Sequence, residues 1–585
     1  MKKILSLLLA VVMLLSCMFV LSSCGEPKDP GAEISVYLGE AIYDFDPSDY
    51  YVSSNAEQVM SLLYEPLFKL NAKGKLECAA AEEYTVDEEN RKIVIALRES
   101  YWSDDIRVKA DDYIYAWREV LLNPSNPNPA AALLYDIENA YETKIGKVSY
   151  AEFGAVKSEI YEITISYREG ADYEQLLKNL ASVATSPLRQ DMVSASKTYW
   201  SKDISTIVTN GPFKIENVDY ELGDFTLARN LGYHQPSTAK KYTKIVNPAA
   251  LVSLMTKDGK LDLTYADIEN KAVFYMGDAT LADRRENSDK AVTAMDASTY
   301  TYVFNTENPL FAKKEVRKAL SLALDRALIA DTVSFGKAAN GFLTDAAAKS
   351  LYGKKTEDRI SADHAKNLAD AKALINTVDF TGLSKAFTLT VNNDEESVAI
   401  AELAKVAWAE LGFTVTVKKV GAVKSTVVDS TLNEEMTILD SGIQTIVKEA
   451  SYGKRNFDVV AVDWQMYSND AFVALAGFTS TMNGCGTDFT TGSARKNISG
   501  WTNTDYDQYI ALAYAAKTEE ERAEALKAAE KILIDSAPVA PIIFNESFAF
   551  VSRDLSKLTV DGFGNFVFTD VKQKHYRDYL NSEEG

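Results

Sequence analysis

The chain has 585 residues, and its 84 acidic side chains against 62 basic ones give a formal net charge of -22 at pH 7. Because sequence-independent phosphate binding needs clustered cations, this charge argues against nucleic acid as a partner. Hydrophobic residues make up 46% of the chain, which is enough for a large core and excludes disordered and collagen-like classes.

The N-terminus carries a targeting signal. Lys2 and Lys3 precede an apolar run that extends to about Leu21, and a short polar stretch ends it. This pattern is typical of a secretory signal. The residues Leu21-Ser22-Ser23-Cys24 resemble the bacterial lipobox, in which the cysteine becomes the lipidated first residue after cleavage. We therefore expect a signal peptide over residues 1–23, a lipid-anchored linker over 24–32 and an extracytoplasmic location at the cell membrane, with an uncleaved membrane anchor as the alternative.

Strand and helix patterns alternate along the rest of the chain. Residues 93–97 alternate like a strand, and Asp111 is placed to cap the helix that follows. The clearest unit is a strand at 387–391, a helix over about 395–411 and a strand at 413–420. This order predicts a β-α-β unit with a parallel strand pair, so the fold class is α/β.

A nearly continuous apolar run at 457–462 predicts a strand that is buried on both faces. The run leads directly into Asp463, Trp464 and Gln465. Ligands of open α/β sheets bind at the carboxyl ends of the strands, so these side chains are candidate ligand contacts.

The sequence contains no recognisable catalytic or metal-binding motif. Its three histidines, His234, His364 and His575, are far apart, and no phosphate loop or nucleophile elbow is present. Cys78 and Cys485 lack a CxxC partner, so they are two buried thiols, one long-range disulfide or part of a soft metal site. We expect no enzyme activity, no metal and no cofactor.

A series of short sequence blocks follows in a fixed order through nearly the whole chain after the signal. The most specific block is Leu97-Arg98-Glu99-Ser100-Tyr101-Trp102-Ser103-Asp104-Asp105, in which Asp105 stands at a position of a turn glycine. The others are Asp44–Pro47, Leu63–Phe68, Lys109–Tyr113, Thr209–Phe213, Arg229–Tyr233, Phe304–Thr306, Val316–Arg326, Ala339–Gly341, Trp501–Asp507 and Ala537–Ile542. Together they resemble the extracytoplasmic solute-binding proteins of peptide-type ABC transporters, the family of the oligopeptide- and dipeptide-binding proteins.

The resemblance implies a two-lobed α/β fold of the periplasmic-binding-protein type, in which the lobes close on a ligand about a hinge. The division it implies is residues 33–65, 206–304 and 552–585 in lobe I, 66–205 in an inserted extra domain, and 305–551 in lobe II, with the chain crossing between lobes near 305 and 552. It also implies a non-enzymatic, monomeric receptor that captures an oligopeptide and delivers it to the permease subunits of an ABC importer.

The cleft loop of this chain departs from the family pattern. In peptide-binding members a DWxxDYxDP-like loop supplies a carboxylate that pairs with the α-ammonium group of the peptide. In the loop from Asp463 to Ala471, Trp464 and Asp470 match, but Tyr467 stands at the key aspartate. Either Asp463 or Asp470 replaces that carboxylate, or the ligand has no free amine there, or the loop aligns a residue or two differently.

The resemblance also places the segment after Asp46-Pro47 in the cleft. Asp49, Tyr50 and Tyr51 would face the ligand from lobe I, and an ordinary exposed loop is the alternative. Aromatic rings grip varied side chains or stack on sugars, so the cleft suits a range of peptides. An oligosaccharide or another amine-free solute is the alternative cargo, and a secreted hydrolase is the alternative from another class, which the missing motifs disfavour.

Overall fold

The protein is described from a computed structural model. The residues that it describes are 32–38, 42, 44–49, 54–122, 127–196, 199–219, 224–234, 249–256, 273–276, 281–353, 359–429, 434–488 and 490–574. The predicted signal peptide and lipidation site, Cys24, lie outside these residues, as do Tyr50 and Tyr51.

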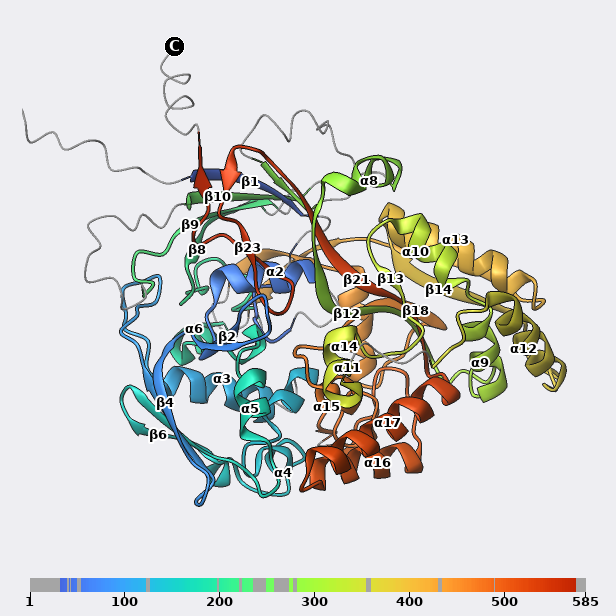
Figure 1. Cartoon of the computed structure of the whole chain (residues 1–585), viewed down its shortest axis with the longest axis horizontal. Coiled ribbons are helices and arrows are strands. Elements are labelled where there is room, and N and C mark those ends of the chain that lie inside the picture. Colours follow the sequence, from blue (N-terminus) through green and yellow to red (C-terminus); the bar gives the residue numbers. More distant parts are fainter. Residues whose placement is uncertain are drawn as a thin grey trace, which may run out of the picture.

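One mixed sheet runs through both lobes (Figure 1). Its strands, in spatial order, are β15 (Thr414–Val420), β14 (Ala386–Asn392), β18 (Val459–Gln465), β12 (Val292–Phe304), β21 (Val539–Val551), β11 (Val273–Tyr275), β1 (Ala32–Leu38), β10 (Ala249–Thr256), β9 (Asp224–Arg229) and β8 (Phe213–Asp219), and β13 (Lys337–Ala338) also pairs with β21. The strands from β11 to β8 form lobe I, at the upper left of Figure 1, and those from β15 to β18 form lobe II, on the right. The predicted two-lobed α/β class is confirmed.

The long antiparallel strands β12 and β21 connect the lobes. Their pairing is interrupted between Met295 and Thr299, and such a bulge bends and twists a strand. At this break the Nδ2 atom of Asn545 donates to Ser298 Oγ at 2.8 Å and to Asp463 Oδ1 at 2.7 Å. The predicted crossing points near residues 305 and 552 lie at the ends of these strands, whereas the break lies inside β12.

The predicted β-α-β unit of lobe II is confirmed. Strands β14 and β15 are parallel and paired along their whole length, and α13 (Glu395–Ala409) connects them. Asp394 starts the helix by accepting the Ser397 backbone N–H at 2.7 Å. Gly412, with φ of 82°, turns the chain into β15. Trp408 is fully buried and donates its indole N–H to the carbonyl of Leu320 at 2.8 Å.

The other helices of lobe II pack against the sheet or against one another. They are α9 (Lys314–Leu322), α10 (Arg326–Val333), α11 (Asp345–Tyr352), α12 (His364–Asn376), α14 (Gly442–Ser451), α15 (Ala471–Ala476), α16 (Thr504–Ala515) and α17 (Glu519–Ser536), and α8 (Leu281–Asn287) precedes β12. A separate hairpin, β16 (Val423–Asp429) and β17 (Glu434–Asp440), lies between β15 and α14. Within the described ranges, no helix is both long and apolar enough to cross a lipid bilayer.

Segment 66–205, the predicted inserted domain, contains its own antiparallel sheet and lies below lobe I in Figure 1. The sheet order is β4 (Ala81–Asp87), β5 (Lys92–Leu97), β7 (Glu162–Ser166) and β6 (Ala155–Glu159), and the α-helices are α3 (Ala110–Leu122), α4 (Ala140–Lys144), α5 (Tyr173–Asn179) and α6 (Gln190–Ala195). Short elements complete the chain: α2 (Ser54–Leu63), β2 (Phe68–Leu70), β3 (Leu76–Cys78), β19 (Thr487–Asp488), β20 (Ser493–Ala494), β22 (Leu555–Ser556), β23 (Thr559–Val560), β24 (Phe566–Val567) and β25 (Lys572–Gln573).

The structure corrects the predicted cap of α3 and distinguishes between the alternatives for the two cysteines. Asp111 does not cap α3 but lies in its first turn, because the helix begins at Ala110. The carboxylate of the neighbouring Asp112 accepts the backbone N–H of Lys109 at 2.9 Å. Cys78 and Cys485 are both free thiols, so the disulfide alternative is wrong. Cys485 is buried, as expected, whereas Cys78 is only half-buried.

Candidate ligand-binding cleft

The lobes are closed against each other along one edge by ion pairs. Lys448 of α14 lies 2.6 Å from the carboxylate of Asp49, which is buried. Lys202 pairs with Asp440 at the end of β17 and lies 3.8 Å from Asp44. Asp49, a predicted ligand contact, is therefore engaged in the contact between the lobes.

At the other edge, Asp470 is buried at the centre of a polar cluster. Its carboxylate accepts from Arg522 Nη2 at 2.9 Å and from Asn179 Nδ2 of segment 66–205 at 3.3 Å. It also caps α15 by accepting the backbone N–H of Phe472 at 2.9 Å. Arg522 lies 4.0 Å from a second carboxylate, Asp136 of segment 66–205. Burial alone would lower the pKa of Arg522, but the two carboxylates raise it above its ordinary value.

A cavity lies between these two edges, at the carboxyl end of β18. Its free volume is about 20 Å³, which is room for about one water molecule. Pro129 comes from segment 66–205, and the other lining residues come from lobe II. The lining consists of Pro129, Val447, Ser451, Val462, Trp464, Gln465, Tyr467, Val473, Gly477, Asn483, Cys485 and Ile498. Most of these side chains are apolar, and none of them carries a full charge.

Three of the predicted site residues line this cavity. Trp464 stacks on Phe478 with ring centroids 4.3 Å apart, and Gly477 permits this position, since an added Cβ there would lie 2.6 Å from the indole ring. Gln465 and Tyr467 are also buried. Tyr467 has φ of 56°, a left-handed conformation that bulky residues rarely adopt.

The two predicted carboxylates do not line the cavity. Side chains alternate across a strand, so Asp463 points to the face of β18 opposite Val462 and Trp464. There it accepts a hydrogen bond from Asn545, and it lies opposite Tyr300 of β12 in the sheet register. Asp470 is held by the cluster around Arg522, as described above.

Sequence reasoning missed much of the lining, because those residues come from distant segments. Pro129, Val447, Asn483, Cys485 and Ile498 were not among the predicted ligand contacts. The sequence shows Cys485 only as a cysteine within a turn-rich stretch, which does not indicate a cavity wall. Burial raises the pKa of the Cys485 thiol to about 11, so this side chain stays protonated and is a poor nucleophile.

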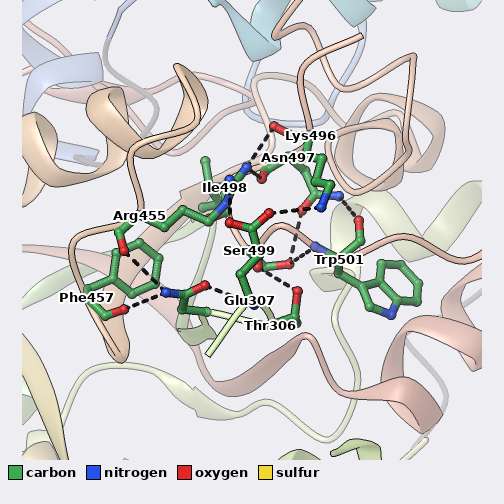
Figure 2. Close-up of polar contacts among 10 residues, drawn as sticks. Thr306, Glu307, Arg455, Phe457, Lys496, Asn497, Ile498, Ser499 and Trp501 are labelled. Carbon is green, nitrogen blue, oxygen red and sulfur yellow. Dashed lines mark hydrogen bonds and ion pairs between the residues drawn. The ribbon is translucent and has the colours of Figure 1, made fainter. Parts of the chain in front are cut away.

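Polar contacts fix the wall formed by Ile498 (Figure 2). Arg455 donates its Nε–H to the Ile498 carbonyl at 3.1 Å, and its Nη1 lies 3.3 Å from the Glu307 carboxylate. Thr306 at the end of β12 donates its hydroxyl to the Ser499 carbonyl at 2.9 Å. These contacts join the loop that carries Ile498 to the strands of lobe II, so this wall of the cavity is preorganised.

The segment that precedes Asp49 contains a carboxyl group with a strongly raised pKa. Burial, followed by the neighbouring Asp49 and Asp44 carboxylates, raises the pKa of Asp46 to about 7. A carboxyl with a raised pKa in the folded state stabilises the fold while it is protonated. This contribution is complete below the ordinary aspartate pKa of about 4 and is lost as the pH rises through about 7.

We therefore expect Asp46→Asn to stabilise the protein at pH 8 and to have little effect at pH 4. The side-chain oxygen of the introduced asparagine can still accept the Ser48 backbone N–H, which Asp46 accepts at 2.9 Å. Because Asp46 is not completely enclosed, solvent screens the effect, and a gain of about 1 kcal/mol in the free energy of unfolding is expected. Urea unfolding at the two pH values measures it. Asp289→Asn, at an exposed position, is the control, and an equal gain in both variants would contradict the assignment to Asp46.

Comparisons with known proteins agree with this architecture. Residues 75–484 match the model of the bacterial extracellular solute-binding proteins, family 5. The murein peptide-binding protein MppA of Escherichia coli is 26% identical over 497 residues, which cover 83% of this chain and 82% of MppA. A probable deoxycholate-binding protein of E. coli, YgiS, is 23% identical, with 91% of this chain and 89% of YgiS covered.

Solved structures share this fold. The structure of E. coli MppA superimposes with a TM-score of 0.73 at 22% identity and covers 92% of this chain and 98% of its own. Haemophilus influenzae OppA in complex with RPPGFSPFR gives a TM-score of 0.72 at 20% identity, with 94% and 100% coverage. The unliganded open form of MppA gives only 0.55 at 22% identity, with 94% and 99% coverage.

The family match extends over most of the chain and confirms the resemblance that the ordered sequence blocks indicated. This chain belongs to the bacterial extracellular solute-binding proteins, family 5.

Proposed function

We propose that the protein is a non-enzymatic receptor that captures an oligopeptide between its lobes and delivers it to the permease subunits of an ABC importer. It acts as a monomer on the outer side of the cell membrane, anchored through lipid on Cys24. The observation that carries the proposal is the contact between the two lobes, in which Lys448 of lobe II pairs with the buried Asp49 of lobe I, close to the carboxyl end of β18. Lobe closure of this kind buries a ligand and gives a transporter one shape to recognise.

Two further points support a peptide receptor. The relatives MppA and OppA are named for murein peptides and oligopeptides, and the chain aligns with them over most of its length. The lining of the cavity also disfavours a hydrolase, because the Cys485 thiol is held protonated, with its pKa raised to about 11 by burial.

The experiment is to purify residues 25–585 and to identify any bound small molecule by native and then denaturing mass spectrometry. We expect a series of peptide masses that are released only on denaturation. If no small molecule is bound, a thermal-shift screen with peptides of several lengths tests whether the protein binds peptides. A ligand at 100 times its dissociation constant adds about 2.7 kcal/mol to the free energy of unfolding and so raises the melting temperature. An empty protein that no peptide stabilises contradicts the proposal.

A second candidate function keeps the receptor role and changes the cargo to an amine-free solute. It is favoured by the positions of Asp463 and Asp470, neither of which lines the cavity, and by Tyr467 at the position of the amine-binding aspartate. The relative YgiS is named for deoxycholate, which has no amine. Binding of one peptide with a free and with an acetylated N-terminus separates the two candidates. An affinity loss of about 100-fold on acetylation would show that the protein holds an ammonium group and would exclude the amine-free reading.

A further inference from the structure

A second, larger pocket lies entirely within lobe II. Its lining includes Thr388 near the start of β14, Asp458 just before β18, and Lys418 of β15, the strand farthest from lobe I in the sheet order. The wall in Figure 2 separates this pocket from the cavity at the carboxyl end of β18, since Arg455 lines the pocket and Ile498 lines the cavity. The free volume of the pocket is about 490 Å³, which is typical of small-molecule sites. Because all of its lining belongs to one lobe, a rotation between the lobes leaves the pocket intact.

Hydrogen bonds fix the walls of this pocket. Both carboxylate oxygens of Asp458 accept bonds, one from Asn308 Nδ2 at 2.8 Å and one from the Thr388 backbone N–H at 2.9 Å. Asn305 donates its Nδ2 to the Phe457 carbonyl at 3.0 Å. The pocket is therefore shaped before a ligand enters, which lowers the ordering cost of binding.

Polar groups without a protein partner lie on the floor of the pocket. Within the described residues, the side chains of Thr388, Thr390 and Lys418 make no hydrogen bond or ion pair. Thr390 is only 3% exposed, and a hydroxyl that is so enclosed is normally hydrogen-bonded. Thr390 and Lys418 are direct neighbours in the register of the parallel strands β14 and β15, so their side chains leave the same face of the sheet. This arrangement indicates that a ligand supplies the missing partners.

The charges of the lining cancel. Lys418 and Arg455 carry two positive charges, and Glu307 and Asp458 carry two negative ones. The charge of Arg455 is engaged by Glu307, whose carboxylate lies 3.3 Å away. An anionic ligand would meet Asp458 and a cationic ligand would meet Lys418, so neither sign is favoured. Alcohol hydroxyls both donate and accept, so a neutral polyhydroxy molecule matches the free ammonium group and the two threonine hydroxyls together.

We propose that this pocket is a second binding site, which takes a neutral sugar of one or two rings and is separate from the cleft that takes the transported cargo. The Lys418 ammonium donates to one ring hydroxyl, and the hydroxyls of Thr388 and Thr390 exchange hydrogen bonds with others. Pro309 and Phe457 supply apolar surface for the C–H groups of the sugar. The site goes beyond the proposed function, because it can be occupied whether the lobes are open or closed.

The test titrates the soluble protein, residues 25–585, with the neutral sugars glucose, N-acetylglucosamine, maltose and cellobiose in a calorimeter. Glucuronate and glucosamine are the charged counterparts of the first two. We expect saturable binding of at least one neutral sugar. Its affinity should exceed that of either charged sugar by about tenfold, because each charge meets a like charge in the lining.

A pair of lysine variants ties this binding to the pocket. Lys418→Met removes the ammonium group and keeps most of the side-chain stem, and the affinity for the neutral sugar is expected to fall by about 20-fold. Lys419→Met is the matched control. Lys419 is the next residue of β15 and is also exposed, but it lies on the opposite face of the strand, outside the lining, so this variant should bind like the wild type.

A pair of threonine variants tests the enclosed hydroxyl. Thr390→Val is expected to weaken sugar binding by about fivefold. Because the Thr390 hydroxyl has no partner in the described protein, the variant should keep the wild-type free energy of unfolding, which distinguishes a lost ligand contact from a folding defect. Thr426→Val changes an exposed threonine of the hairpin strand β16, outside the lining, and is the control.

The outcomes separate this inference from the proposed function. Binding that Lys418→Met and Thr390→Val weaken, and that the two controls do not, supports the site. If none of the neutral sugars binds, or if the charged sugars bind equally well, the site is overturned and the peptide receptor is unaffected. Sugar binding that no variant weakens, or that all four weaken equally, also overturns it, and such a sugar would favour the amine-free cargo of the cleft.

Discussion

Replacement of Gly484 by alanine is expected to keep the lobes apart and to weaken ligand binding by about 100-fold. Gly484 has φ of 74°, and its carbonyl accepts the backbone N–H of Asn128 at 2.9 Å, where segment 66–205 meets lobe II. An added Cβ would lie 2.1 Å from the Asn128 carbonyl oxygen and 2.8 Å from the Cα of Pro129. These are backbone atoms that cannot rotate away, so the closed state is penalised while each lobe stays folded. A hundredfold loss corresponds to about 2.7 kcal/mol.

Small-angle scattering with and without ligand, together with calorimetry, measures this effect. Gly492→Ala is the matched control, because Gly492 has a similar φ of 69° but an added Cβ there meets no atom within 4 Å. Both variants carry the backbone strain of alanine in the left-handed region, about 1 kcal/mol. Only Gly484→Ala should stay open in the presence of ligand. Equal ligand-induced compaction in the two variants would show that this contact does not limit closure.

Arg522→Met is expected to lower the free energy of unfolding by about 3 kcal/mol, with a matching loss of closure. The substitution leaves Asp470 buried without its cation, whereas Asp136 keeps Arg168, which lies 2.5 Å away. Methionine retains most of the contact that the Arg522 side chain makes with the ring of Phe472, 5.0 Å from the guanidinium carbon. The loss therefore reports the unpaired charge and not a packing defect. Chemical denaturation at pH 7 measures it.

Two further variants make this prediction specific. Lys517→Met removes an ion pair with Glu169 at 3.0 Å in the same region, but both side chains are more than 70% exposed, so a loss of less than about 1 kcal/mol is expected. Arg522→Met combined with Asp470→Asn should recover much of the lost stability, because the buried charge is then removed together with its partner. Additive losses in the double variant would mean that the two groups act independently.

The sequence by itself determined those features that depend on neighbouring residues. The period of apolar positions predicted the β-α-β unit over 387–420, and the run at 457–462 predicted β18, which the structure extends to Gln465. The sequence also showed that Asp105 stands at a position where a turn glycine is usual. Asp105 has φ of 66°, so the turn keeps the left-handed geometry that glycine would favour. The ordered blocks indicated the family because they mark such local turns and buried faces.

Only the tertiary structure decided what the side chains of the cleft loop do. Trp464, Gln465 and Tyr467 line a cavity, whereas Asp470 pairs with Arg522, 52 residues further along the chain, and Asp463 lies on the opposite face of β18. The sequence shows that a strand or helix has a buried face, but not which distant segment covers it. A carboxylate next to a predicted site can hold a ligand or stabilise the protein, and the choice depends on contacts with residues that are distant in the sequence, which form only when the chain folds.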